Sequence, residues 1–171
     1  MRQILTEYPE IEGAQIQFNY LDYESVSVES RKVYEVCRKH GKPVIIMEPL
    51  RGGRLVNLLP EKAKKCFEDY PVKRSAAEWG LRWLWDQESV TVVLSGMGEE
   101  TMLRENLAVA SAVHPGELGE AERELYTRVI RAINESVKVG CTGCGYCMPC
   151  PKGVDIPGSF RCLNEIAIEG I

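Results

Sequence analysis

The sequence is poor in histidine, has no cluster of basic residues and has no long apolar run. Its two histidines, His40 and His114, belong to no ligand or catalytic motif, so we expect both to be surface or loop residues. The net charge of −4 and the lack of a run of Lys or Arg argue against binding to nucleic acid or to anionic membranes. The apolar runs are far shorter than the roughly 20 residues of a membrane-spanning helix. These absences predict a compact soluble domain.

The first ten residues, MRQILTEYPE, have no apolar core of the kind found in secretory signal peptides, because they contain two carboxylates and a proline. We therefore expect a cytoplasmic protein. Thiols stay reduced in that compartment, so the seven cysteines of this 171-residue chain suit metal binding better than disulfide formation.

Three segments have the pattern of parallel β-strands. They cover residues 14–18, 43–47 and 90–94, and the last two are almost purely apolar and β-branched. Continuous apolar runs are typical of parallel strands that are covered on both sides, so we expect both faces of these strands to be buried.

Helical patterns lie between and after these strands, over residues 25–40, 75–87, 99–113 and 119–136. The second helix begins with Ser75 and Glu78 at the spacing of a capping box. The last one is amphipathic and aligns Ala121, Leu125, Val129 and Ile133. The alternation of strands and helices predicts an α/β fold built from right-handed βαβ units.

The segment CTGCGYCMPC, residues 141–150, contains four of the seven cysteines. Cys141, Cys144 and Cys147 are each separated by two residues, a spacing that lets one coiled loop turn three thiolates toward a single [4Fe–4S] cluster. The glycines between them let the backbone approach the cluster and donate N–H groups to its sulfur atoms. The spacing therefore favours an iron–sulfur site.

The fourth ligand is expected to be Cys150, because Cys150 and Pro151 end the run as iron–sulfur motifs do, although the last gap is one residue shorter. Cys162 is the other candidate. A zinc site or a disulfide cluster is a weaker alternative, since zinc knuckles usually lie a dozen or more residues apart. Cys37 and Cys66 lie within helical patterns and are expected to be buried or half-buried side chains.

The character of the sequence changes near residue 138. Gly140 ends the helical pattern, and Cys, Gly and Pro dominate from there to residue 158. We therefore expect an α/β part over residues 1–138 and a cysteine-rich iron–sulfur segment over residues 139–171.

The motifs of the α/β part resemble those of a known enzyme family. AQIQFNYLD, VIIMEPLRGG and VTVVLSGMGEETMLRENLAVA resemble the sixth, seventh and eighth strands of the aldo/keto reductase barrel and the turns that follow them. CTGCGYCMPCPKGVDIP resembles the ferredoxin-type tail that one branch of this family carries. The resemblance implies a partial (β/α) barrel of the TIM type, formed by the last three strands and their helices, followed by a helical iron–sulfur tail.

The resemblance also implies a site for NAD or NADP. In the family, the position of Gln15 meets the nicotinamide carboxamide, and the position of Met47 lies under the nicotinamide ring. The turn after the second strand passes the pyrophosphate, and the turn after the third strand is a second phosphate-site turn. The RENL element meets the adenine end. The implied cofactor residues are Gln15, Met47, Leu50, Arg51, Gly52, Gly96, Met97, Glu105 and Asn106.

Two further positions bear on the same site. NADP-preferring members carry basic side chains where this chain has Gly96 and Met102, so the resemblance implies little selection for a 2′-phosphate. Glu48, at the carboxyl end of a strand, is expected to point toward the mouth of a barrel.

The function implied is hydride transfer between a nicotinamide cofactor and a small carbonyl or alcohol substrate, with the cluster serving electron relay to a partner or serving structure. The Tyr, Lys, Asp and His that catalyse the reaction in this family come from the first half of the barrel and have no counterpart here. We therefore expect this chain to be the carboxy-terminal part of such an enzyme and to be inactive alone. The alternatives are a small ferredoxin-like electron carrier, which would need neither EPLRGG nor RENL, and a structural zinc module.

Overall fold

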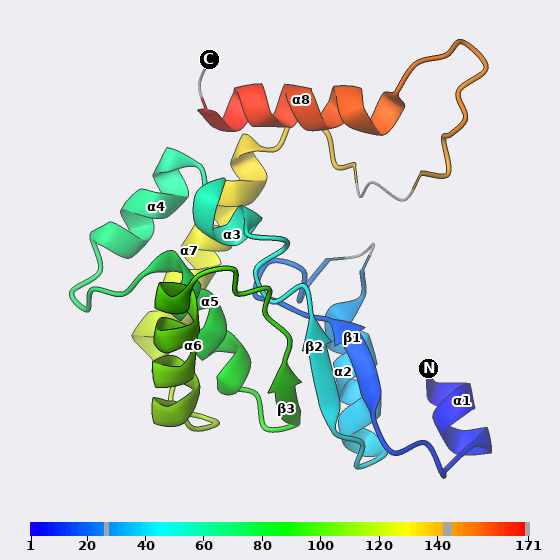
Figure 1. The fold of residues 1–171 in the computed structure, drawn as a ribbon, viewed down its shortest axis with the longest axis vertical. Helices are drawn as coiled ribbons and strands as arrows, with labels where there is room; N and C mark the ends of the chain where they lie inside the picture. Colours follow the sequence, from blue (N-terminus) through cyan, green and yellow to red (C-terminus); the bar gives the residue numbers. More distant parts are fainter. Residues whose placement is uncertain (26–27, 142–144, 170–171) are drawn as a thin grey trace.

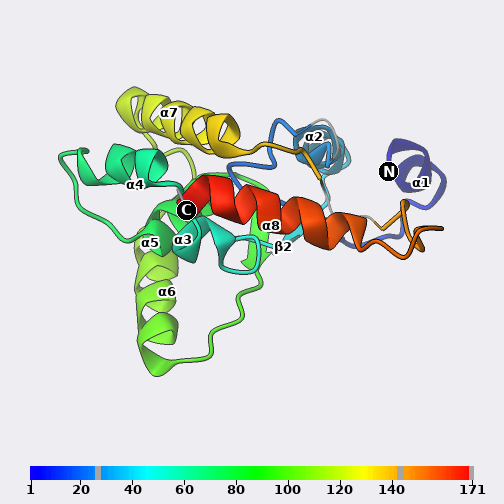
Figure 2. The same cartoon turned by 90° about the horizontal axis from the view of Figure 1, so that it is seen from above.

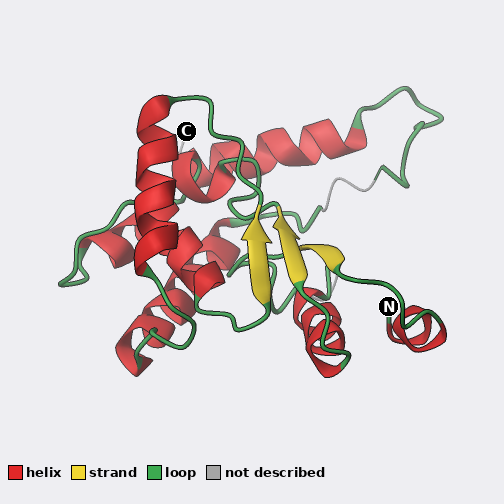
Figure 3. Ribbon diagram, turned by 60° about the horizontal axis from the view of Figure 1, so that its bottom comes forward, coloured by secondary structure: helices red, strands yellow, loops and turns green. Residues whose placement is uncertain are grey.

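The computed structural model describes residues 1–25, 28–141 and 145–169. Three parallel strands form one sheet in the order β1 (Ala14–Gln17), β2 (Val44–Met47) and β3 (Val90–Val93). Figure 3 shows the strands side by side in yellow. Ala14 is paired with Val44, and Val44 with Val90, with a register shift between Val44 and Ile45. The three predicted strands and their parallel arrangement are confirmed.

The described residues form eight helices, which Figure 1 labels: α1 (Arg2–Glu7), α2 (Ser30–Lys39), α3 (Arg54–Asn57), α4 (Glu61–Glu68), α5 (Ala76–Trp85), α6 (Glu100–Ala112), α7 (Glu120–Ser136) and α8 (Ile156–Glu169). The four predicted helices correspond to α2, α5, α6 and α7. The first of them begins at Ser30 rather than at residue 25, because the chain after β1 forms turns over residues 20–24. The predicted cap of α5 is present, since Ser75 Oγ accepts a hydrogen bond of 3.0 Å from the Glu78 N–H.

One expectation about the sheet is wrong, because the strands are not buried on both faces. Ala14, Ile16, Val44 and Ile46 are buried on the face that the helices cover, whereas Val92 in β3 is 41% exposed. In the parts of the chain that the structure describes, no further layer covers the other face. The apolar composition of β3 therefore does not correspond to burial in this chain.

The helical core packs around Trp79 of α5, which is fully buried. Its ring stacks on Phe67 of α4, with centroids 5.5 Å apart and an interplanar angle of 10°. Tyr126 of α7 donates a hydrogen bond of 2.7 Å to the Trp79 carbonyl oxygen. Leu125, Val129 and Ile133 are buried as predicted, whereas Ala121 at the start of α7 is exposed.

The tail begins after α7 and ends in α8, which crosses above the carboxyl ends of the strands (Figures 1 and 2). Asp155 caps α8, since its Oδ1 accepts a hydrogen bond of 3.0 Å from the Gly158 N–H. Asn164 of α8 is buried and binds the backbone of Lys138 and Val139 through three hydrogen bonds of 2.7–2.9 Å. This single side chain joins both ends of the tail. No described helix is long and apolar enough to cross a membrane.

Candidate functional site at the carboxyl ends of the strands

Gln15 and Met47 lie next to each other on the open face of the sheet. Gln15 Nε2 lies 3.3 Å from Met47 Sδ, and both side chains are exposed. The pairing follows from the register, because Gln15 is opposite Ile45 and Gln17 is opposite Met47 on adjacent strands. Thus the Gln15 amide and the Met47 thioether, which are 32 positions apart in sequence, lie side by side next to the turn that follows β2.

A buried hydrogen-bond network forms the turn after β1. Asp22 Oδ2 accepts hydrogen bonds of 2.8 Å from Gln17 Nε2 and from Asn19 Nδ2. Asn19 Nδ2 also donates to the Glu48 carbonyl oxygen at 3.0 Å, which ties this turn to the turn after β2. Asn19 and Asp22 are almost completely buried, so water does not compete for these hydrogen bonds and the network holds its geometry without a ligand.

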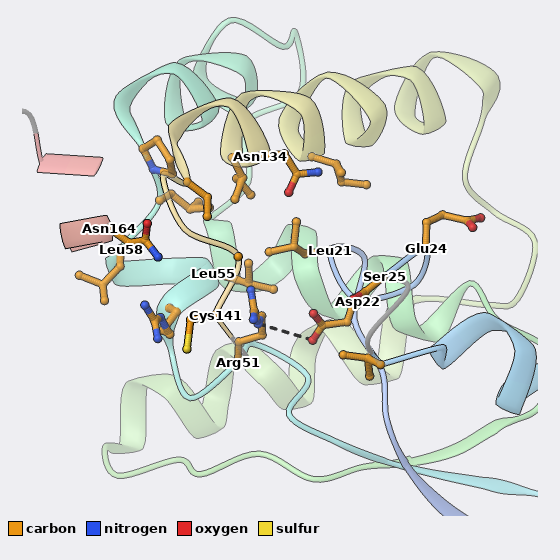
Figure 4. A pocket seen from close by; sticks show the side chains of 18 of the residues that line it. Leu21, Asp22, Glu24, Ser25, Arg51, Leu55, Leu58, Asn134, Cys141 and Asn164 are labelled. Carbon is orange, nitrogen blue, oxygen red and sulfur yellow. Dashed lines mark ion pairs between the residues drawn. The ribbon is translucent and has the colours of Figure 1, made fainter. Parts of the chain in front are cut away.

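Arg51 is held by this network. Its Nε lies 3.5 Å from Asp22 Oδ2, and Figure 4 shows the ion pair as a dashed line. The Asp22 side chain is only 5% exposed, whereas the Arg51 side chain is 36% exposed. The buried carboxylate therefore orients a guanidinium that still reaches solvent and that has donors left for an anion.

The turn from Glu48 to Gly53 has an unusual backbone. Glu48, Arg51, Gly52 and Gly53 all have positive φ, at 54°, 50°, 61° and 84°. For the two residues with a side chain this conformation is strained, so the surrounding contacts must maintain it. Among the described residues, the N–H groups of Gly52 and Gly53 have no hydrogen-bond acceptor. Two backbone donors are therefore available beside Arg51.

Leu50 supports this turn from below. A Cβ placed on Gly80 of α5 would lie 2.5 Å from Leu50 Cδ2, so only a glycine leaves room for the leucine in this position. Leu50 is thus a packing residue between the turn and α5.

The predicted cofactor residues after β3 lie in the turn before α6 and in the middle of that helix. Asn106 Nδ2 donates a hydrogen bond of 3.1 Å to Ser95 Oγ, and Ser75 donates a hydrogen bond to Glu105. Gly96 and Met97 are exposed. A shallow depression of about 300 Å³ lies here, lined by Ser95, Met97, Gly98, Glu99, Glu100 and Leu103. Its two glutamates make the depression acidic.

The cysteine run is described only in part. Cys141 and Cys147 are exposed, Cys150 is half-buried, and Cys144 lies outside the described residues. Hydrogen bonds from the backbone N–H groups of Lys152 and Val154, and a weaker one from Gly153, lower the pKa of the Cys150 thiol. Within residues 1–25, 28–141 and 145–169, no three His, Cys, Asp or Glu side chains are grouped to hold a metal ion. Cys37 is buried and Cys66 half-buried, as predicted.

The structure therefore joins Gln15 to Met47, and Asn106 to Ser95, and places the Arg51 turn after β2. The sequence reasoning missed Asn19 and Asp22. Their signal is two polar residues directly after a strand, at the edge where parallel sheets bind ligands. It also missed Asn164, which has no local motif because its partners lie 25 and 26 residues earlier.

A parallel sheet whose ligand-binding turns follow the strands is the arrangement of β/α-barrel enzymes. The chain matches the model of the aldo/keto reductase family over residues 1–117 and therefore belongs to that family. No curated protein sequence matches the chain.

Two solved structures support this assignment at the level of the fold. They are the holo and apo forms of the aldo-keto reductase AKR11C1 from Bacillus halodurans, each 20% identical to this chain, with TM-scores of 0.56 and 0.55. The similarity covers 75% of this chain but only 46% of the holo form and 47% of the apo form. The chain thus spans about half the length of these relatives.

Proposed function

We propose that this chain supplies the last three strands of an iron–sulfur aldo/keto reductase. The intact protein would transfer hydride between NAD(P)H and a small carbonyl or alcohol substrate. The observation that carries the proposal is the Arg51 turn, where a buried carboxylate orients a guanidinium next to two unused backbone N–H groups. These donors suit the pyrophosphate of a dinucleotide.

The remaining predicted residues complete the cofactor site in this proposal. The Gln15 amide offers a donor and an acceptor to the nicotinamide carboxamide, and Met47 packs against the ring. Leu50 and Gly52 shape the turn after β2, Gly96 and Met97 form the second phosphate-site turn, and Glu105 and Asn106 meet the adenine end. The glutamates at the start of α6 repel a 2′-phosphate, so we expect NAD to bind at least as well as NADP.

We also propose that Cys141, Cys144, Cys147 and Cys150 hold a [4Fe–4S] cluster. The donor chemistry fits, because thiolates bind iron and the backbone N–H groups around Cys150 stabilise its thiolate. When bound, such a cluster would supply one-electron transfer. The tail over residues 139–171 would then be a second unit, whose two ends Asn164 joins and which it ties to Lys138 at the end of the α/β part.

Two buried tyrosines of this chain do not suit acid–base catalysis. Burial raises the pKa of Tyr20 and of Tyr126 well above the usual range of a phenol, and Arg51 opposes this shift at Tyr20 only in part. Both groups are removed from solvent. This supports our expectation that the 171 residues alone do not reduce carbonyl compounds at an ordinary rate of about 1 per second or more.

The test combines cofactor titration with metal analysis. We expect NADH to bind the full chain, and Arg51→Gln to weaken binding about tenfold, since it removes a charge-assisted hydrogen bond. Arg131→Gln, a change on the exposed face of α7, is the matched control and should leave the affinity unchanged. Equal affinities of Arg51→Gln and the parent would contradict the cofactor site.

Anaerobic reconstitution should produce a brown protein with about four irons per chain. Cys150→Ser should lose iron and Cys162→Ser should retain it. One zinc without sulfide would instead indicate a structural zinc module. Iron and sulfide without any NADH binding would favour a ferredoxin-like carrier.

A further inference from the structure

A cavity of about 680 Å³ lies between the carboxyl ends of β1 and β2 and the start of the tail (Figure 4). Its lining includes Asp22 from the turn after β1, Arg51 from the turn after β2, and Cys141 from the tail. The volume falls in the range of small-molecule sites, roughly 300–1,000 Å³. The cavity is therefore large enough for an organic ligand in addition to the groups that line it.

About half of the wall is apolar. Leu55 and Leu58 line it from α3 and its end, and Ile130 and Ile133 line it from α7. Figure 4 shows Leu55 and Leu58 on one side of the cavity and Asp22 and Glu24 on the other. An occupant must accordingly present an apolar body to the helices and a polar group to the strand ends.

The cavity lining carries two carboxylates and two guanidinium groups, and one of these guanidinium groups has no partner among the described residues. Asp22 pairs with Arg51, and Glu24 pairs with Arg31 at 3.3 Å. Arg54 lines the cavity, and its guanidinium forms no ion pair or hydrogen bond with any described residue. A ligand that carries one negative charge could pair with this exposed guanidinium.

The tail forms one wall of the cavity, and hydrogen bonds hold this wall in place. Val139 and Asn164 both line it, and the Asn164 amide donates to the Val139 carbonyl oxygen at 2.7 Å and accepts from the Val139 N–H at 2.9 Å. Because Asn164 is buried, this contact is protected from water. The shape of this partly open cavity thus depends on α8 as well as on the α/β part.

We propose that this cavity binds an organic monocarboxylate: a carboxylate that pairs with Arg54, on an apolar body that packs against Leu55, Leu58 and Ile133. The site adjoins the proposed cofactor turn but uses a different cation. The carboxylate site is therefore a second ligand site, and its existence does not depend on the proposed function.

The test uses the full chain and three probes of equal length: hexanoate, hexan-1-ol and hexylamine. Titrations followed by amide chemical shifts should show hexanoate binding with shifts at residues that line the cavity. Hexan-1-ol should bind at least fivefold more weakly, and hexylamine should not bind, since the charge selects the ligand. Hexanol binding as tightly as hexanoate would overturn the proposal.

Arg54→Gln should weaken hexanoate binding about tenfold through loss of the ion pair. Leu58→Trp should weaken both hexanoate and hexan-1-ol, because it fills the apolar part. Arg131→Gln is again the control. Unchanged hexanoate affinity in Arg54→Gln would refute the site. If the chain binds NADH but not hexanoate, the carboxylate site is refuted and the proposed function stands. If it binds hexanoate but not NADH, the proposed cofactor site is refuted and the carboxylate site stands.

Discussion

At the scale of single residues, the two buried phenols differ in one respect that controls stability. Tyr126 donates a hydrogen bond of 2.7 Å to the Trp79 carbonyl oxygen, whereas the Tyr20 hydroxyl is buried without a partner among the described residues. A satisfied buried hydroxyl stabilises the fold, and an unsatisfied one lowers its stability. The same substitution should therefore have opposite effects at these positions.

We expect Tyr126→Phe to lower the free energy of unfolding by about 1–2 kcal/mol, because it removes a buried hydrogen bond. Tyr20→Phe should leave it unchanged or raise it by up to about 1 kcal/mol, because it removes a desolvated hydroxyl. Urea unfolding of both variants measures the difference. A larger loss in Tyr20→Phe than in Tyr126→Phe would contradict the assignment.

Alkaline pH should destabilise the protein through the same tyrosines. The folded state raises the pKa of Tyr20 and Tyr126, so above pH about 10 the unfolded chain releases protons that the folded chain retains. Stability is then fully present below pH about 10 and falls as the pH rises, by up to about 1.4 kcal/mol per pH unit for each tyrosine. Urea unfolding at pH 9, 10 and 11 should show a shallower decline in Tyr126→Phe. If the free energy of unfolding falls equally with pH in the parent and in Tyr126→Phe, the raised pKa of Tyr126 is not the cause of the decline.

At the scale of elements, α5 and the turn after β2 fit together through one contact. A Cβ on Gly80 would lie 2.5 Å from Leu50 Cδ2, so the helix has a glycine where alanine would otherwise be preferred by about 1 kcal/mol. The packing requirement of the turn thus overrides helix propensity in α5.

A double-mutant cycle tests this. In the Leu50→Ala background, Gly80→Ala should raise the free energy of unfolding by about 1 kcal/mol, because the obstacle is gone. In the parent the same change should be neutral or destabilising, which gives a coupling energy of roughly 0.5–3 kcal/mol. Additive effects in thermal or urea unfolding would show that the two residues do not conflict.

The tail is attached at the element scale by Asn164. Asn164→Ala removes three hydrogen bonds of about 1 kcal/mol each and should release the segment before Cys141, so trypsin should cleave after Lys138 at least tenfold faster. Asn134→Ala, on the exposed surface of α7, is the matched control. Equal cleavage rates in the two variants would mean that Asn164 does not hold the tail.

At the scale of the whole molecule, the open face of the sheet exposes apolar side chains outside the core. Val92, Leu94 and Met47 are each about 40% exposed along β2 and β3. Exposed apolar strands that lack a neighbour are sites of self-association. This surface therefore sets the behaviour of the chain in solution.

We expect Val92→Lys with Leu94→Lys to reduce self-association, measured by analytical ultracentrifugation, and to change the free energy of unfolding by less than about 1 kcal/mol. Ile46→Thr, on the buried face, should instead cost about 2 kcal/mol or more. Similar destabilisation by the lysine pair would show that the open face is packed in solution.

The sequence alone determined the features that depend on near neighbours in the chain. The β-branched runs specified β2 and β3, the Ser75–Glu78 spacing specified the start of α5, and the i+4 pattern specified the buried face of α7 at Leu125, Val129 and Ile133. The motifs after the strands identified the family, which the match over residues 1–117 confirms. Propensity, capping and periodicity act over a few residues, so each can be recognised without knowing the path of the chain.

Only the tertiary structure decided which distant residues meet. Asp22 holds Arg51 across 29 positions, Gly80 makes room for Leu50 across 30, and Asn164 binds Val139 across 25. Burial followed the same rule, because the apolar β3 remains half-exposed where no described element covers its open face. No local pattern encodes these outcomes, since packing and ion pairing depend on how turns and helices come together in space.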